Sequence, residues 1–221
     1  MDHSIVAAAA AELRATLLPQ ADAGRASAMR AYMRDRFIFL GIPTPARRAA
    51  IKPVLKNFKQ AEWLLPLARS LWAMQEREYH YAALDLLAMH YKQLRVAEIP
   101  ALIQLAQQHA WWDTVDAMAG VIGDVLRHGH DYMDDAIADN DFWVRRIALL
   151  HQLGWRDKTD AQRLFTYCTA VAHEKEFFIQ KAIGWALRDY ARHAPDAVRA
   201  FTAQHRNILA PLSYREANKH L

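Results

Sequence analysis

Four segments of this 221-residue chain open a predicted helix with a cluster of aromatic residues, at nearly regular intervals. The clusters begin at Tyr79, Trp111, Phe142 and Phe177, which lie 32, 31 and 35 residues apart. Intervals of this size are typical of helical-hairpin repeats, in which each repeat buries its apolar face against its neighbours. The pattern therefore favours an α-solenoid over a closed helical bundle. Such arrays have a concave face that can cradle an extended partner.

Composition also favours helices along the whole chain. Hydrophobic residues make up 53% of the sequence, which excludes a disordered chain, and only seven glycines and eight prolines interrupt it. No run of strict apolar alternation indicates a sheet. No shift in composition marks a second domain, so we expect one all-α domain over residues 1–221. The predicted helices span residues 5–18, 23–36, 45–57, 60–73, 78–93, 97–109, 113–127, 130–138, 141–153, 159–172, 175–192 and 195–204.

The sequence also restricts where the protein works. One cysteine, Cys168, excludes an internal disulfide framework and a multi-cysteine zinc site, and it fits a reducing compartment. The alanine run at residues 7–11 lacks a preceding basic region, so we interpret it as an opening helix and not as a signal peptide. No apolar stretch approaches the roughly 20 residues of a membrane span. We expect a cytoplasmic protein without membrane contact.

Basic residues are concentrated near the N-terminus. The net charge is +4, the sequence pI is about 9.2, and Asp35 is the only acid in residues 25–59. Such a block is consistent with a surface for a polyanion or with an ordinary solvated helical face, and charge alone does not decide. The basic residues in it are Arg25, Arg30, Arg34, Arg36, Arg47, Arg48, Lys52, Lys56 and Lys59.

The segment Trp111-Trp112-Asp113-Thr114-Val115-Asp116 places two indoles and two carboxylates within six residues. Carboxylates beside aromatic faces can stabilise a short-lived cation, such as the one formed when a glycosidic bond breaks. If the helix already includes Trp112, this residue and Asp116 share one helix face. Alternatively, Asp113 is the N-cap and Asp116 an acid of the first turn, with both tryptophans packed in the core.

Two further segments need an explanation. Arg145 and Arg146 follow Trp143 early in a predicted helix, where positive charge opposes the helix dipole. Their partners are either a phosphate, which a guanidinium binds through two hydrogen bonds, or intramolecular carboxylates. Gly184 lies inside a strong helix beside Trp185 and costs about 1 kcal/mol relative to alanine, which suggests close approach of another backbone or a ligand. Trp185 itself fits either core packing or a site.

A metal site is also considered, at His128-Gly129-His130-Asp131 with Asp134 and Asp135 nearby. Helical metal-dependent phosphohydrolases use His-Asp pairs, but Gly129 and the position between two helices favour a capping loop. There is no His-Glu-x-x-His motif, no Gly-rich phosphate loop and no nucleophilic serine elbow. Cys168 lies in an apolar run without an obvious base, so it is a poor nucleophile.

Several of these segments resemble the AlkD-like DNA alkylation repair family, from about residue 25 to the C-terminus. The matching segments are Trp111-Trp112-Asp113-Thr114-Val115-Asp116, Trp143-Val144-Arg145-Arg146 and residues 177–188, 31–33, 39–45 and 211–217. The resemblance implies a bacterial DNA glycosylase of HEAT-like repeats that excises 3-methyladenine and 7-methylguanine. The chain departs from the family pattern at Ala110, where a residue with a hydroxyl group is expected.

The resemblance also assigns roles to individual residues. It makes Asp116 the catalytic carboxylate, flanked by Trp112 and Trp185. Arg146, together with Arg145, would hold the DNA backbone beside the lesion, and Tyr32 would be a further contact near the same cleft. The basic block would then contact phosphates without reading sequence, and from it we select Arg47, Arg48 and Lys52 as DNA-binding residues.

The resemblance implies a base excision repair enzyme that holds the lesion against the duplex. An alkylated purine cation is already a good leaving group, so a single acid suffices. We expect a monofunctional enzyme without metal or cofactor, acting as a monomer on duplex DNA that carries alkylated purines, with no obligate protein partner and in the bacterial nucleoid. One alternative is a non-catalytic HEAT-like module that binds nucleic acid or protein. Another is a metal phosphohydrolase centred on His128, His130 and Asp131.

Overall fold

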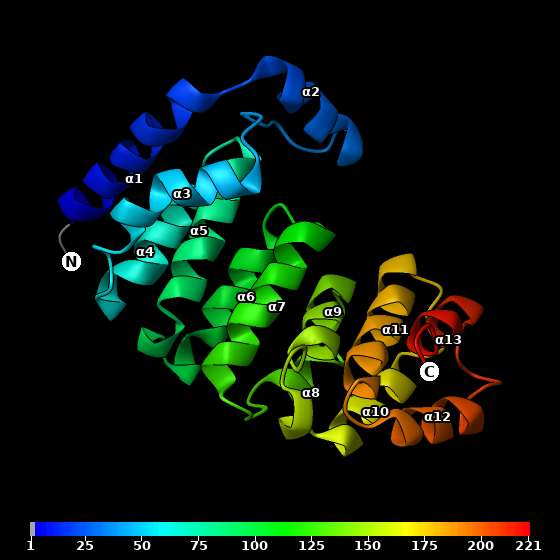
Figure 1. Cartoon of the computed structure of the whole chain (residues 1–221). Coiled ribbons are helices and arrows are strands. Elements are labelled where there is room, and N and C mark those ends of the chain that lie inside the picture. Colours follow the sequence, from blue (N-terminus) through cyan, green and yellow to red (C-terminus); the bar gives the residue numbers. More distant parts are fainter. Residues whose placement is uncertain (1–2) are drawn as a thin grey trace. The chain divides into compact units, whose positions relative to one another are not determined.

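A computed structural model describes residues 3–221 of the chain and divides it into two compact units, one that ends at Arg95 and one that comprises Val96–Leu221 (Figure 1). The described residues contain no strand, only an isolated parallel bridge between Ile38 and Glu76. The predicted all-α fold is thus confirmed. None of the helices in this part of the chain has the length and apolarity that crossing a membrane requires.

The first unit is built on four helices that pack around leucine-rich faces. Helix α4 packs along α5, and α1 packs against both α3 and α4. Leu13 and Leu17 of α1 are fully buried, as are Leu64 and Leu71 of α4. The elements of this unit are α1 (His3–Leu17), η1 (Leu18–Gln20), α2 (Ala23–Tyr32), α3 (Thr44–Leu55), α4 (Ala61–Trp72), α5 (Arg77–Met89) and η2 (Tyr91–Gln93).

The loop before α3 is organised by one buried carboxylate. Glu78 is 1% exposed, and its side chain accepts hydrogen bonds from the backbone N–H groups of Leu40, Gly41 and Ile42 at 2.9, 2.8 and 3.1 Å. Gly41 has φ +89°, and a Cβ there would lie 2.1 Å from the carbonyl oxygen of Asp22. Only glycine therefore fits this turn. The turn determines where α3 begins and thereby where the basic residues of α3 lie.

The second unit stacks helices in the order of the chain. Helix α7 packs against α6 and α9, α9 against α11, and α11 against α12 and α13. The stack agrees with an α-solenoid, and α7, α9 and α11 lie side by side in Figure 1. The elements are η3 (Val96–Glu98), α6 (Ile99–Gln107), α7 (Trp112–Leu126), α8 (Met133–Ala136), α9 (Phe142–Leu150), η4 (Arg156–Lys158), α10 (Ala161–Ala170), α11 (Phe177–Ala191), α12 (Pro195–Gln204) and α13 (Pro211–Ala217).

Candidate active site

Helix α7 begins two residues earlier than the capping alternative requires. Trp111 is the N-cap residue with extended backbone (φ −158°, ψ 160°), and Trp112 is already helical. Asp113 therefore lies in the first turn, and its predicted alternative role as N-cap is wrong. Trp112 and Asp116 are four residues apart in one helix and share a face. Both side chains are half-buried, whereas Trp111 is buried against Trp143 and Phe178.

The Asp116 carboxylate is held by Arg146 of the neighbouring helix α9. Arg146 Nε donates to Asp116 Oδ1 at 2.7 Å, and Arg146 Nη2 donates to Oδ2 at 2.8 Å. The remaining nitrogen, Nη1, donates to the carbonyl oxygen of Phe178. The Arg146 side chain is 1% exposed, against 21% for Asp116. All three guanidinium nitrogens thus have partners inside the protein, and the carboxylate alone reaches solvent.

This environment acts on the pKa of Asp116 in two directions. Burial raises the pKa of the carboxyl above its ordinary value of 3.8, and the nearby charge of Asp113 adds to this. The hydrogen bonds and the charge of Arg146 lower it, and the net direction is upward. A carboxylate in this setting is weakly hydrated, so its charge acts strongly on a cation brought next to it.

Trp185 joins this pair from helix α11. The Arg146 Cζ atom lies 5.4 Å from the centroid of the Trp185 ring and 5.8 Å from that of Phe178. These distances are within the range of cation–π attraction. Trp185 is half-buried, so it is not a plain core residue. Three successive helices of the stack, α7, α9 and α11, therefore bring Asp116, Arg146 and Trp185 together.

Gly184 is explained by the last helix. A Cβ at Gly184 would lie 2.4 Å from Cβ of Glu216 and 3.1 Å from the carbonyl oxygen of Ser213, both in α13. The Ser213 hydroxyl also donates to the carbonyl oxygen of Gln180 in α11 at 2.9 Å. The close approach that the sequence indicated is thus an approach of α13 to α11, next to Trp185.

Arg145 is bound to a carboxylate of its own. Its Nε and Nη2 donate to Glu174 at 2.8 and 2.7 Å, and its Nη1 donates to the carbonyl oxygens of Asp139 and Asn140 at 2.6 and 3.0 Å. The side chain is 18% exposed. Both arginines of the Trp143 segment therefore have the intramolecular carboxylate partners that were the alternative to phosphate.

Comparisons with known proteins identify the family of the chain. Residues 13–221 match the DNA alkylation repair enzyme family. The chain belongs to this family. Its fold is similar to a solved structure described as a predicted DNA alkylation repair enzyme from Enterococcus faecalis, with 34% sequence identity and a TM-score of 0.84 over 91% of this chain and 96% of that one. No curated protein matches the chain.

The other residues predicted to bind DNA in this repair enzyme belong to the first unit, whereas the Asp116 site belongs to the second. Arg47 is 4% exposed and pairs with Asp85 of α5 at 3.1 Å, so it is not available at the surface. Arg48 pairs with the same carboxylate at 2.9 Å but is 64% exposed. Lys52 is exposed on α3, and Tyr32 is 73% exposed at the end of α2. Asp85 lies outside the basic segment, so inspection of that segment alone missed it.

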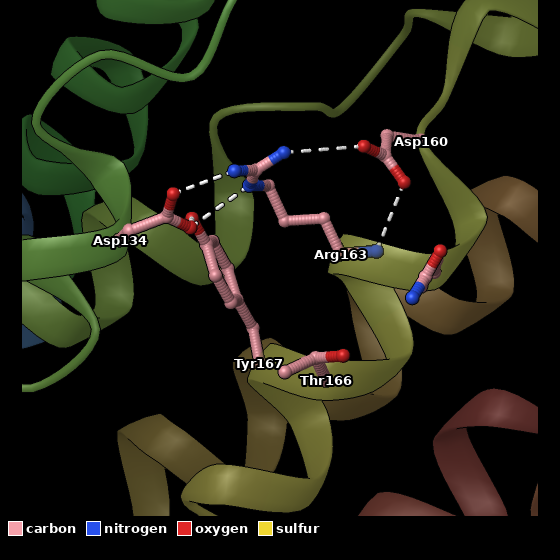
Figure 2. A pocket seen from close by; sticks show the side chains of 6 residues that line it. Asp134, Asp160, Arg163, Thr166 and Tyr167 are labelled. Carbon is pink, nitrogen blue, oxygen red and sulfur yellow. Dashed lines mark hydrogen bonds and ion pairs between the residues drawn. The ribbon is translucent and has the colours of Figure 1, made fainter.

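The segment considered for a metal forms a different polar cluster at the C-terminal side of α7 and α9. Asp134 and Asp160 line a cavity of about 310 Å³, and Arg163 binds both carboxylates (Figure 2). The Tyr167 hydroxyl donates to Asp134 at 2.6 Å. Within residues 3–221 no group of three His, Cys, Asp or Glu side chains is arranged to hold a metal ion. The cluster therefore gives the phosphohydrolase alternative no geometric support.

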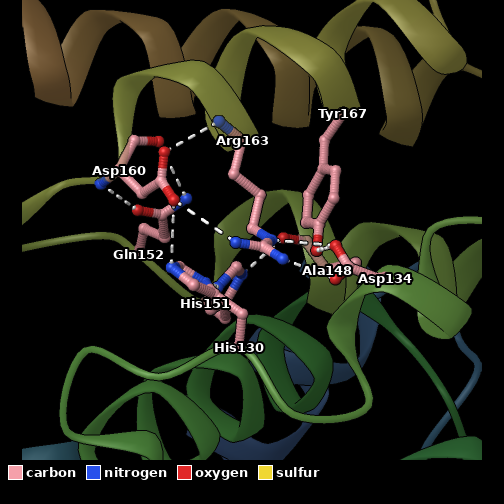
Figure 3. Close-up of polar contacts among 8 residues, drawn as sticks. All are labelled: His130, Asp134, Ala148, His151, Gln152, Asp160, Arg163 and Tyr167. Carbon is pink, nitrogen blue, oxygen red and sulfur yellow. Dashed lines mark hydrogen bonds and ion pairs between the residues drawn. The ribbon is translucent and has the colours of Figure 1, made fainter.

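Two histidines of this cluster, His130 and His151, pair with each other. Nδ1 of His130 lies 3.0 Å from Nε2 of His151, and Nε2 of His130 lies 3.5 Å from Asp160 (Figure 3). The ring of His128 packs edge-on against Trp155. Sequence inspection selected His128 and His130 but missed His151, which lies on α9's C-terminal side and had no motif to mark it.

Proposed function

We propose that this DNA alkylation repair enzyme is a monofunctional DNA glycosylase. It hydrolyses the N-glycosidic bond of cationic alkylated purines, 3-methyladenine and 7-methylguanine, in duplex DNA during base excision repair. The observation that carries the proposal is the partly exposed Asp116 carboxylate, held in a fixed plane by the Arg146 fork. As a repair enzyme it would act in the cytoplasm, where bacterial DNA lies, and a monomer suffices because α7, α9 and α11 of one chain supply the site.

The reaction needs little from the protein besides a well-placed negative charge. In an N3- or N7-alkylated purine the base is cationic, so the C1′–N bond breaks with both electrons going to the base, which leaves neutral and unprotonated. The sugar that remains has oxocarbenium character, and water adds to its C1′. Asp116 stabilises that cation and accepts the proton that the water loses, a role worth typically 10²–10⁴-fold.

Arg146 acts as a positioning residue in this scheme. Its fork fixes both oxygens of Asp116, whose remaining lone pairs stay free for the sugar or the water. This differs from the phosphate contact that the sequence suggested, because the guanidinium is buried and all its nitrogens are engaged. Trp112, one turn before Asp116, and Trp185, beside Arg146, would flank the cationic sugar with their rings.

The proposal is tested by the release of free methylated bases from methylated duplex DNA, in EDTA. We expect Asp116→Asn to lower release at least about 100-fold while DNA binding is retained. The matched control is Asp124→Asn, an exposed aspartate two turns along the same helix, which should retain wild-type release. A wild type that binds DNA without releasing bases would support the non-catalytic module instead. Metal-dependent cleavage of phosphoester bonds, lost in EDTA, without release of free bases would support the phosphohydrolase.

A further inference from the structure

Lys181 lies beside the candidate active site without a role in the chemistry described so far. It precedes Trp185 by one turn of α11, and its Nζ atom is 5.8 Å from the centroid of the Trp185 ring. Its side chain is 26% exposed. The ammonium group is therefore next to a residue of the site and within reach of a ligand that approaches from solvent.

One carboxylate of the last helix holds this lysine in place. Glu216 of α13 accepts from Lys181 Nζ at 3.0 Å and from Arg188 Nη1 at 2.8 Å, and its side chain is 13% exposed. The hydrogen bond from Lys181, together with both positive charges, holds the pKa of Glu216 below its ordinary value, so the group is an anion at neutral pH. Gly184 permits this contact, because a side chain there would collide with Glu216.

The charges in this cluster do not cancel. Lys181 and Arg188 carry two positive charges and Glu216 one negative charge, which leaves a net charge of +1 beside Trp185. The two arginines of α9 form one-to-one pairs instead, Arg146 with Asp116 and Arg145 with Glu174. A phosphate of the bound DNA would therefore find its complementary charge at Lys181.

Arg188 also lowers the energetic cost of moving Lys181 from Glu216 to a phosphate. If Lys181 turns from Glu216 to a phosphate, Arg188 still pairs with the carboxylate, so no buried charge is left alone. Arg146 has no such freedom, because its departure would leave the partly buried Asp116 without its cation. The arrangement separates two tasks: Arg146 holds the catalytic carboxylate, and Lys181 is available to the DNA backbone.

We propose that Lys181 is the phosphate-binding residue of the active site and contacts the backbone of the DNA strand that carries the lesion. Glu216 and Arg188 are its positioning residues, which keep the ammonium beside Trp185 in the free enzyme. This inference rests on the proposed function, since it assigns a DNA contact to the same site. It adds to that function the residue that places the sugar–phosphate backbone against Asp116.

The test measures how DNA affinity depends on salt, using a duplex with a tetrahydrofuran abasic-site analogue as probe. Each phosphate contact contributes about 0.9 to the slope of log K against log salt concentration. We expect Lys181→Met to lower the slope by about that amount, and Lys181→Arg to restore it. The affinity advantage of the wild type over Lys181→Met should then shrink about 3.5-fold between roughly 50 and 200 mM salt.

Arg199→Met in α12 is the matched control, because it removes one positive charge and one carboxylate pair, that with Asp196, outside the candidate site. It should leave the slope within about 0.3 of the wild type, since a general loss of charge is not a phosphate contact. An unchanged slope in Lys181→Met, or an equal decrease in both variants, would overturn the assignment of Lys181. Base release measured in parallel keeps the two proposals separate: an enzyme that fails to release bases but shows the slope change refutes the glycosylase proposal alone.

Discussion

The two oxygens of Asp116 each accept one hydrogen bond from the guanidinium of Arg146, at 2.7 and 2.8 Å. The two residues are 30 positions apart in sequence and belong to neighbouring helices of the stack, α7 and α9. A planar fork of this kind sets the orientation of the carboxylate as well as its position. The packing of two consecutive helical repeats thus determines where the reactive group points.

Replacing Arg146 by lysine should therefore impair base release. Lysine keeps the positive charge but has no planar fork, so the carboxylate loses its fixed orientation, and we expect a decrease on the order of 100-fold in single-turnover release. Arg145→Lys is the matched control, because it breaks a similar two-bond pair with Glu174. Thermal unfolding should show similar destabilisation of both variants. An equal loss of activity in both would mean that the Asp116–Arg146 pair serves only stability.

The raised pKa of Asp116 predicts an acid limit to activity. The ionised form is the active one, so base release falls as pH decreases through the pKa of this group, which burial places above the ordinary 3.8. The measurement is single-turnover release against pH, corrected for spontaneous loss of the base. The rate should decrease as one proton is taken up, and Asp116→Asn should lack this decrease. A constant ratio of wild-type to Asp116→Asn rates across the acid range would assign the limit to another group.

The local sequence predicts most of the helices, but it fails where tertiary contacts determine where a helix ends or whether it forms. The helix expected at residues 23–36 ends at Tyr32, because Arg34 and Asp35 both adopt left-handed backbone with φ +56°. Helix α13, Pro211–Ala217, was absent from the predicted helices. Seven residues are too few for an apolar period to be recognised, and this helix depends on its packing against α11.

In the candidate site, too, the local spacing of residues could be predicted from the sequence, but contacts between helices could not. Helical spacing predicted that Trp112 and Asp116 share a face, and it marked Gly184 as a point of close approach. The partner of each arginine could not be predicted from the sequence. Asp116 and Asp85 come from other helices, Glu174 comes from the loop before α11, and none of them has a fixed offset in sequence from its arginine. Burial of Arg146 and Arg47 therefore became visible only in the folded chain.

Gly184 should not tolerate alanine. A methyl group there meets Cβ of Glu216 at 2.4 Å and the carbonyl oxygen of Ser213 at 3.1 Å, so α13 must move away from α11. We expect a loss of about 1–3 kcal/mol in the free energy of unfolding, in spite of the better helix propensity of alanine. Gly120→Ala in α7 is the control, since nothing lies within 4 Å of its Cβ position. That variant should gain roughly 0.5–1 kcal/mol. Urea unfolding of both variants measures these two changes in the free energy of unfolding. A Gly184→Ala variant more stable than the wild type would show that α13 is only loosely packed against α11.

His151 predicts a pH dependence of stability that is separate from catalysis. The ring is 1% exposed; its Nδ1 donates to the carbonyl oxygen of Ala148 at 2.6 Å, which leaves Nε2 to accept from His130. Burial lowers the pKa of His151 from 6.5 to about 4, so below pH 6.5 the unfolded chain binds a proton that the folded chain does not. Stability is complete above pH 6.5 and falls as pH decreases toward 4, by about 2 kcal/mol between pH 7.5 and 5.

Urea unfolding at these two pH values, for the wild type and His151→Gln, isolates this contribution. Glutamine cannot titrate, so the variant should be less stable at pH 7.5 yet lose about 2 kcal/mol less than the wild type on going to pH 5. Its remaining decrease comes in part from His130, whose pKa burial also lowers. Carboxylates whose pKa is depressed, such as Asp134, titrate below this range and affect both proteins alike. Equal pH dependence in the two proteins would mean that His151 accepts a proton in the folded state, with a pKa near 6.5.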